Sequence, residues 1–158
     1  MIRDWKTTKP QLEDVITDKN MLDFATWLKA NNMPPTWLDI HEQHAIAWTV
    51  NHDGKNMFVV LDDKDALSFM VQGLLTSEYQ SYIIDNNLQD IVTENLQHCS
   101  RKDGEHCGNC DLPSHVAGVD LTIFGKEAKN ICCGHMITFK NPDEKSVATL
   151  KMLLGICV

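Results

Sequence analysis

Cysteine and histidine side chains crowd one stretch of the sequence, residues 99–135. Five of the six cysteines and three of the seven histidines fall inside it. Cys107 and Cys110 are separated by Gly108 and Asn109, which favour a tight turn that directs both sulfur atoms toward one point. Thiolates brought together in this way bind soft metal ions. The spacing therefore predicts a metal site in this stretch.

Two further cysteines complete a predicted four-cysteine zinc site. One lies upstream of Cys107 and Cys110 and one lies downstream. Their two sulfur atoms would complete a tetrahedron of ligands around the ion. The predicted ligands of a structural Zn²⁺ ion are Cys99, Cys107, Cys110 and Cys132. Such an ion would order a segment that is rich in Asp, Gly and His and poor in apolar residues.

Other ligand sets remain open at this stage. Cys133 directly follows Cys132 and competes with it for the same place. His115 and His135 are near enough in sequence for either to replace one cysteine in a Cys₃His site, which zinc also accepts. Free thiols in a surface loop are the alternative without a metal.

Two other chemical motifs fit their templates poorly. In the HEQH run of residues 41–44 the histidines are three apart, whereas the helical zinc-protease motif needs them four apart on one face. Cys107 and Cys110 resemble a redox pair, but the pattern around them does not place them at a helix N-terminus after a strand. We therefore expect a polar loop at 41–44 and no thioredoxin-like site.

Composition limits the possible partners. The formal net charge is −8 and the lysines are dispersed, which argues against a nucleic-acid partner because phosphates would be repelled. No apolar run is long enough to span a membrane, and the first residues lack the apolar core of a signal peptide. These features predict a cytoplasmic protein, a compartment in which clustered cysteines more often bind metal or do redox work than form structural disulfides.

The hydrophobic pattern predicts a helical N-terminal element over residues 10–31, after an extended arm. Pro10 suits a first helical turn, Asn20 suits the cap of a second helix, and Pro34 ends it. The period then changes to two, which predicts a three-stranded meander with a turn at Asp53 and Gly54. The expected strands are 45–50, 57–61 and 66–71.

The second half of the sequence predicts helices over 77–85 and 88–96, a strand over 136–139 and a last helix that starts at Pro142. Residues 99–135 are expected to be an irregular cysteine-rich loop inserted before that strand. Strands joined by hairpins and flanked by helices indicate an α+β fold with an antiparallel sheet. The whole chain, residues 1–158, is expected to form one domain.

The C-terminal third contains four features that occur together: Cys99, the CGNC run of 107–110, the TIFGKEAKNIC run of 122–132 and the TFKNPDEKSVATLKMLLGI run of 138–156. In these features the chain resembles a family of small uncharacterised bacterial proteins. In that family a cysteine cluster precedes an FGKE-type segment, a further cysteine, a short strand and a last helix that begins at NPD. The resemblance implies no activity, and it favours Cys132 over Cys133 as the ligand.

The sequence supports two classes of function. The first is a non-enzymatic, zinc-stabilised binding or regulatory module for a protein or a small apolar ligand. A pocket between sheet and helices would suit such a ligand, with Trp48 and Tyr82 as candidate wall residues. The second is a metal- or thiol-dependent enzyme or sensor that uses the cysteine cluster. The first class is favoured because no nucleophile with its base and no phosphate-binding glycine loop can be named.

Overall fold

The computed structural model describes residues 4–40, 43–52, 55–62, 66–71, 77–99, 118–132 and 134–154. The chain divides into two compact units, Met1–Phe69 with Phe139–Val158 and Met70–Thr138. Within the ranges described, no helix combines the length and the apolar character that a membrane crossing needs.

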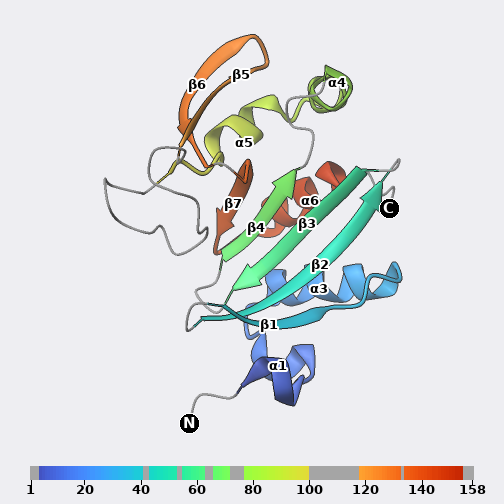
Figure 1. Ribbon diagram of the computed structural model, residues 1–158. Helices are drawn as coiled ribbons and strands as arrows, with labels where there is room; N and C mark the ends of the chain where they lie inside the picture. Colours follow the sequence, from blue (N-terminus) through green and yellow to red (C-terminus); the bar gives the residue numbers. More distant parts are fainter. Residues whose placement is uncertain are drawn as a thin grey trace. The chain divides into compact units, whose positions relative to one another are not determined.

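Strands with antiparallel pairing account for the β part of the fold. The larger sheet has the strand order β1-β2-β3-β4-β7, and β5 pairs with β6 in a separate two-stranded sheet. β1 pairs antiparallel with β2, and β2 pairs antiparallel with β3 (Figure 1). The bounds are β1 (Thr36–Ile40), β2 (Gln43–His52), β3 (Lys55–Asp62), β4 (Ala66–Val71), β5 (Val119–Ile123), β6 (Lys126–Ile131) and β7 (Met136–Lys140).

Helices accompany both sheets, so the predicted α+β class is confirmed. Their bounds are α1 (Trp5–Thr8), α2 (Leu12–Val15), α3 (Lys19–Ala30), α4 (Ser77–Asp85), α5 (Gln89–Glu94) and α6 (Glu144–Leu153). The cap of α3 is Asp18 rather than the predicted Asn20, because the Asp18 carboxylate accepts a hydrogen bond of 2.8 Å from the Met21 N–H. Asp143 caps α6 in the same way, through the Ser146 N–H at 2.7 Å.

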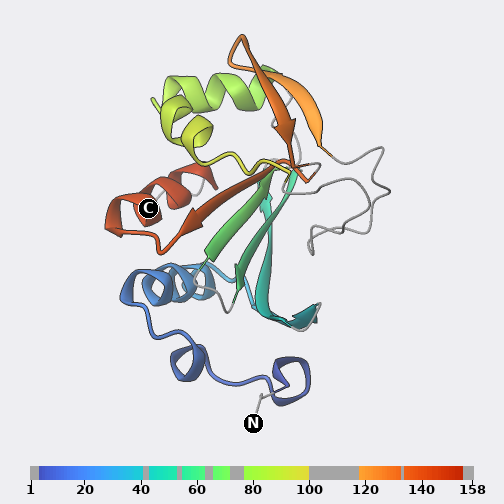
Figure 2. The same cartoon turned by 90° about the vertical axis from the view of Figure 1, so that its left-hand side faces the viewer.

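In the first unit, α3 and α6 cover one face of the sheet (Figures 1 and 2). The apolar stripes predicted for these helices are the buried ones. They consist of Met21, Phe24, Ala25 and Leu28 on α3 and of Val147, Leu150, Leu153 and Leu154 on and just after α6. Lys151 joins the helices, because its Nζ lies 3.0 Å from Asp23 Oδ2 and 5.6 Å from the centre of the Trp27 ring. Trp48 of β2 is fully buried, so it belongs to this core rather than to a pocket wall.

In the second unit, a short extended segment after α5 connects three parts of the chain through its backbone. Gln97 N–H donates to Met136 O at 2.9 Å, and its own carbonyl accepts from Cys132 N–H at 2.8 Å. Asn95 O accepts a hydrogen bond from Thr138 N–H, and Cys99 N–H donates to Asn130 O near the end of β6. These bonds attach β6, and with it the β5–β6 hairpin, to the extended segment that follows α5.

Tyr79 and Tyr82 belong to this unit. Tyr79 is buried, and burial raises the pKa of its phenol well above the usual value. Tyr82 on the same helix lies against it, with ring centroids 6.2 Å apart.

Three segments differ from the sequence-based predictions. The expected extended arm contains α1, which Asp4 caps, and β1 forms a strand that was not predicted. Within the expected irregular loop of 99–135, residues 119–131 form the β5–β6 hairpin. β6 exposes most of its side chains and buries Ile131, so it carries too few apolar residues to give a strand signal.

Removal of the Asp18 cap should destabilise the first unit. We expect Asp18→Ala to lower the free energy of unfolding by about 1 kcal/mol, because the Met21 N–H loses its acceptor. Asp18→Ser restores an acceptor and should stay close to the unmutated protein in urea unfolding. Equal losses for both variants would contradict a capping role.

Acid should weaken the α1 cap. Hydrogen bonds from the Thr7 hydroxyl and N–H stabilise the Asp4 carboxylate and lower its pKa from 3.8 to about 2. Because the pKa is lower in the folded state, the charged Asp4 carboxylate stabilises the fold at pH values above 3.8, and this stabilisation is lost as the pH falls toward about 2. We therefore expect the difference in melting temperature between the unmutated protein and Asp4→Asn to shrink over this range. A difference that is constant with pH would contradict the assignment.

Candidate functional site

Cys99 and Cys132 are the two predicted zinc ligands that the structure describes. They lie on two paired extended segments, Cys99 after α5 and Cys132 directly after β6. Cys99 N–H donates to Asn130 O, Cys132 N–H donates to Gln97 O, and His98 is paired with Ile131 between them. Since neighbouring residues of a strand point to opposite faces, both cysteines share the face opposite to this central pair. Both are half-buried, and neither forms a disulfide with another described residue.

The register places these cysteines diagonally across the ladder. Diagonal neighbours lie roughly 7–8 Å apart, with their Cβ atoms somewhat closer than that, whereas a disulfide needs Cβ atoms roughly 3.5–4.5 Å apart. A direct disulfide between Cys99 and Cys132 would therefore require the backbone to move.

The prediction of a bound zinc ion is wrong for the described part of the chain. Among those residues, no group of three or more His, Cys, Asp or Glu side chains is arranged to hold a metal ion. The ladder brings together two of the four predicted ligands, Cys99 and Cys132, and a tetrahedral site needs at least three protein ligands. Cys107, Cys110 and Cys133 lie outside the described residues.

In the described part of the chain, the histidines near this ladder do not join its cysteines in a group that could hold a metal ion. His98 is exposed, and its Nδ1 lies 3.1 Å from Lys129 O. His135 occupies a turn with φ +51°, where its N–H donates to Cys132 O at 2.8 Å. His115, the other alternative ligand, lies outside the described residues.

Gly118 allows the chain to approach Cys99 closely. Its φ is +75°, and a Cβ placed on it would lie 2.2 Å from Asn130 Oδ1. The Asn130 side chain needs that space, because its Nδ2 donates to Cys99 O at 3.1 Å while its backbone N–H donates to Asp120. A residue other than glycine at 118 would disturb the end of the cysteine ladder.

In the other unit, His44 lies on β2 rather than in the expected polar loop. Its Nδ1 is 2.5 Å from Asp39 Oδ1, and its ring stacks on Trp5 with centroids 4.9 Å apart. The other Asp39 oxygen accepts from Lys6 N–H at 3.1 Å. These contacts attach α1 to β1 and β2. His41 and Glu42 of the HEQH motif lie outside the described residues.

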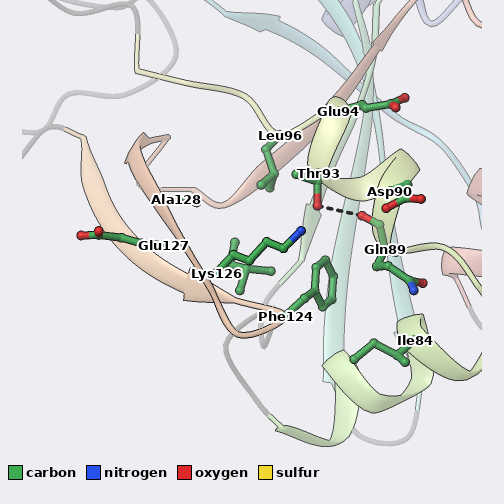
Figure 3. A pocket seen from close by; sticks show the side chains of 11 residues that line it. Ile84, Gln89, Asp90, Thr93, Glu94, Leu96, Phe124, Lys126, Glu127 and Ala128 are labelled. Carbon is green, nitrogen blue, oxygen red and sulfur yellow. Dashed lines mark hydrogen bonds between the residues drawn. The ribbon is translucent and has the colours of Figure 1, made fainter.

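A cavity of about 610 Å³ lies within the second unit, between the end of α4, α5 and the β5–β6 hairpin (Figure 3). Its apolar wall is formed by Ile84, Leu96, Ile123, Phe124 and Ala128. Its polar wall is formed by Gln89, Asp90, Thr93, Glu94, Lys126 and Glu127. Ile84 is among the large apolar residues that remain exposed, at 44%. The size and mixed character of this cavity match those of small-molecule sites, which are roughly 300–1,000 Å³.

The β5–β6 turn places an aromatic ring on the cavity wall. Ile123 pairs with Lys126, so Phe124 and Gly125 form a two-residue turn, and their φ values are +52° and +74°. Asn, Asp and Gly are the residues that favour such a turn, and a left-handed backbone costs other residues roughly 1–2 kcal/mol. Gln80 of α4 supports the turn, because its Oε1 accepts from Phe124 N–H at 3.1 Å. The Phe124 ring is half-buried and points from the turn toward α5 (Figure 3).

Four polar side chains on the cavity wall differ in their contacts. Thr93 Oγ1 donates to Gln89 O at 2.8 Å, one turn earlier in α5. Gln89 Oε1 is buried and has no hydrogen-bond donor among the described residues. Lys126 extends from β6 across the cavity toward α5, whereas Glu127 points away from it (Figure 3). Glu127 instead pairs with Lys129 at 3.3 Å.

The sequence pattern did not predict this cavity. The Phe-Gly pair between short apolar runs was the one signal of the turn on its wall. Trp48 and Tyr82, which were predicted as pocket residues, do not line the cavity.

Comparison of the chain with family models, with curated proteins and with solved structures finds no significant match. The resemblance to a bacterial protein family stays a prediction.

Proposed function

We propose that this protein is a non-enzymatic binding or regulatory module that holds a small ligand in the cavity between α5 and the β5–β6 hairpin. The observation that carries the proposal is the cavity itself, about 610 Å³ in volume and formed within one compact unit. Its apolar wall supplies the area that an apolar ligand would bury, and its few polar groups supply orientation.

The chemistry of the wall favours binding over catalysis. The Thr93 hydroxyl donates its hydrogen to the Gln89 carbonyl and lies on an exposed turn of α5. Among the described residues the cavity wall contains no histidine or cysteine, and the hydrogen bond of this hydroxyl goes to a backbone carbonyl rather than to a side chain that could act as a base. A net charge of −8 also argues against a nucleic-acid ligand. We place the module in the cytoplasm, as the cysteine content suggests.

Filling the cavity should abolish ligand binding. We expect a screen of small apolar compounds by melting shift to find ligands that stabilise the protein, since binding to the folded state alone raises stability by RT ln(1 + [L]/Kd). Ala128→Leu adds a side chain to the cavity wall and should remove these shifts. Thr122→Leu introduces the same side chain at an exposed position of the neighbouring strand, outside the wall, and should retain them.

The two variants separate cavity binding from surface binding. If the melting shifts survive in Ala128→Leu, or disappear equally in both variants, the cavity is not the binding site. If no compound stabilises the protein, the proposal fails.

A second candidate function is thiol-based redox sensing by the cysteines. It is favoured by the position of Cys99 and Cys132, two half-buried thiols on one face of a ladder. Formation of a disulfide from two thiols releases two protons and two electrons, which hydrogen peroxide takes up as it is reduced to two water molecules. The diagonal separation opposes a bond between these two cysteines, so each would need a third cysteine as its partner.

Peptide mapping after peroxide treatment of the folded protein tests this candidate. We expect linked peptides that join Cys99 or Cys132 to another cysteine, and none that joins the two to each other. Cys99→Ser and Cys132→Ser should each remove one of the linked peptides, and Cys157→Ser serves as the control outside the cluster. A dominant Cys99–Cys132 peptide would contradict the register, and an absence of linked peptides would eliminate redox sensing.

A further inference from the structure

Among the described wall residues, Lys126 is the charged residue that faces the interior of the cavity. Its side chain extends from β6 across the cavity toward α5 (Figure 3). Three carboxylates also belong to the wall, and all three point elsewhere. Glu127 points away from the cavity, and Asp90 and Glu94 project from the side of α5 that is turned away from the hairpin (Figure 3). A ligand inside the cavity therefore meets the ammonium before it meets a carboxylate.

Helix geometry explains the direction of the two carboxylates on α5. Thr93 lies on the side of α5 that faces the hairpin (Figure 3). Glu94 follows Thr93 by one position and is therefore turned roughly 100° around the helix axis. Asp90 lies one turn before Glu94 and shares its side. Both acidic residues are exposed, so water and salt screen their repulsion of an anion inside the cavity.

The Lys126 ammonium has no carboxylate partner in the described part of the chain. The ion pairs found there involve other side chains, such as Lys129 with Glu127 on the same strand. Lys126 is exposed, so water solvates its ammonium in the empty protein. A carboxylate that enters the cavity replaces this water and forms a charge-assisted hydrogen bond with the ammonium.

The apolar part of the same wall leaves surface uncovered. Ile84 is 44% exposed, and Phe124 is half-buried. Leu96 and Ile123, which complete this part of the wall, are buried. An apolar group that covers Ile84 and Phe124 removes their exposed surface from water, which is favourable. The ligand that suits the cavity therefore combines an apolar tail with an anionic head.

We propose that the cavity binds a small monocarboxylate with an apolar tail. The carboxylate pairs with Lys126 Nζ, and the tail lies against Ile84 and Phe124. This inference rests on the proposed function, because it names the class of ligand for the same cavity.

A single negative charge matches this wall better than two. One ammonium neutralises one carboxylate. A doubly charged head, such as a phosphate monoester, would keep an uncompensated charge on a wall that also carries Asp90 and Glu94. An uncharged head would gain no ion pair with Lys126.

Hexanoate and hexanamide test the charged head. They share one tail, and the amide is uncharged at neutral pH. In titrations of the unmutated protein followed by NMR, we expect both compounds to shift the resonances of Ile84 and Phe124. Hexanoate should bind about fivefold more tightly, which is the ratio that one exposed ion pair provides. High salt should reduce this ratio, because it screens the pair.

Substitution of Lys126 tests the partner of the carboxylate. Lys126→Met keeps a side chain of similar length without the charge, so this variant should bind hexanoate no more tightly than hexanamide. Lys140→Met removes one positive charge at an exposed position outside the wall and should keep the preference for hexanoate. The melting temperatures of the two variants check that each is folded.

Any of three results would overturn the inference. The first is equal affinity of the unmutated protein for the two compounds. The second is a preference for hexanoate that survives in Lys126→Met. The third is an equal loss of this preference in Lys126→Met and Lys140→Met, which would assign it to the net charge of the chain.

Failure of this inference is distinguishable from failure of the proposed function. If hexanoate does not bind while other compounds still lose their melting shift in Ala128→Leu, this inference fails and the proposed function stands. If no compound responds to Ala128→Leu, the proposed function fails as well.

Discussion

Backbone hydrogen bonding by the few residues after α5 is the constraint on which the second unit depends. Gln97 N–H donates to Met136 O, and Gln97 O accepts from Cys132 N–H, so one residue joins two separate stretches of chain. Bridges between Leu96 and Ile137 and between His98 and Ile131 accompany these bonds. Because Leu96, Ile131 and Ile137 are buried, the bonds lie beside apolar side chains and are partly shielded from competing water. The position of the β5–β6 hairpin beside α5 follows from this pairing.

The position of the hairpin beside α5 explains how its strained turn is supported. A two-stranded hairpin is marginally stable alone, and β6 exposes most of its side chains to solvent. The hairpin is instead fixed at one end by the segment after α5 and at its turn by Gln80 of α4. Support from two sides allows Phe124 to keep an unfavourable backbone conformation, and the ring then forms part of the cavity wall.

The same pairing determines what the described cysteines can do. It places Cys99 and Cys132 on one face but diagonally apart, because one residue pair separates them on the ladder. Shared orientation without close approach explains why two cysteines that look like partners in the sequence form neither a disulfide nor a metal site among the described residues. On one face of a ladder, residues that are two positions out of register are diagonal neighbours rather than direct partners.

The sequence by itself determined the α+β class, the helices α3, α4 and α6 with their buried stripes, and the strands β2, β3 and β4, because these features depend on local periodicity and on capping residues. Only the tertiary structure decided the β5–β6 hairpin and the cavity. The strands of that hairpin carry few apolar residues and gain their stability from partners distant in sequence, such as the pairing of Ile131 with His98. Phe124 likewise reads as an ordinary core residue until the turn and α5 surround it. Sequence spacing assigned four cysteines to one predicted site. Strand register, which no local pattern encodes, determined where two of them lie.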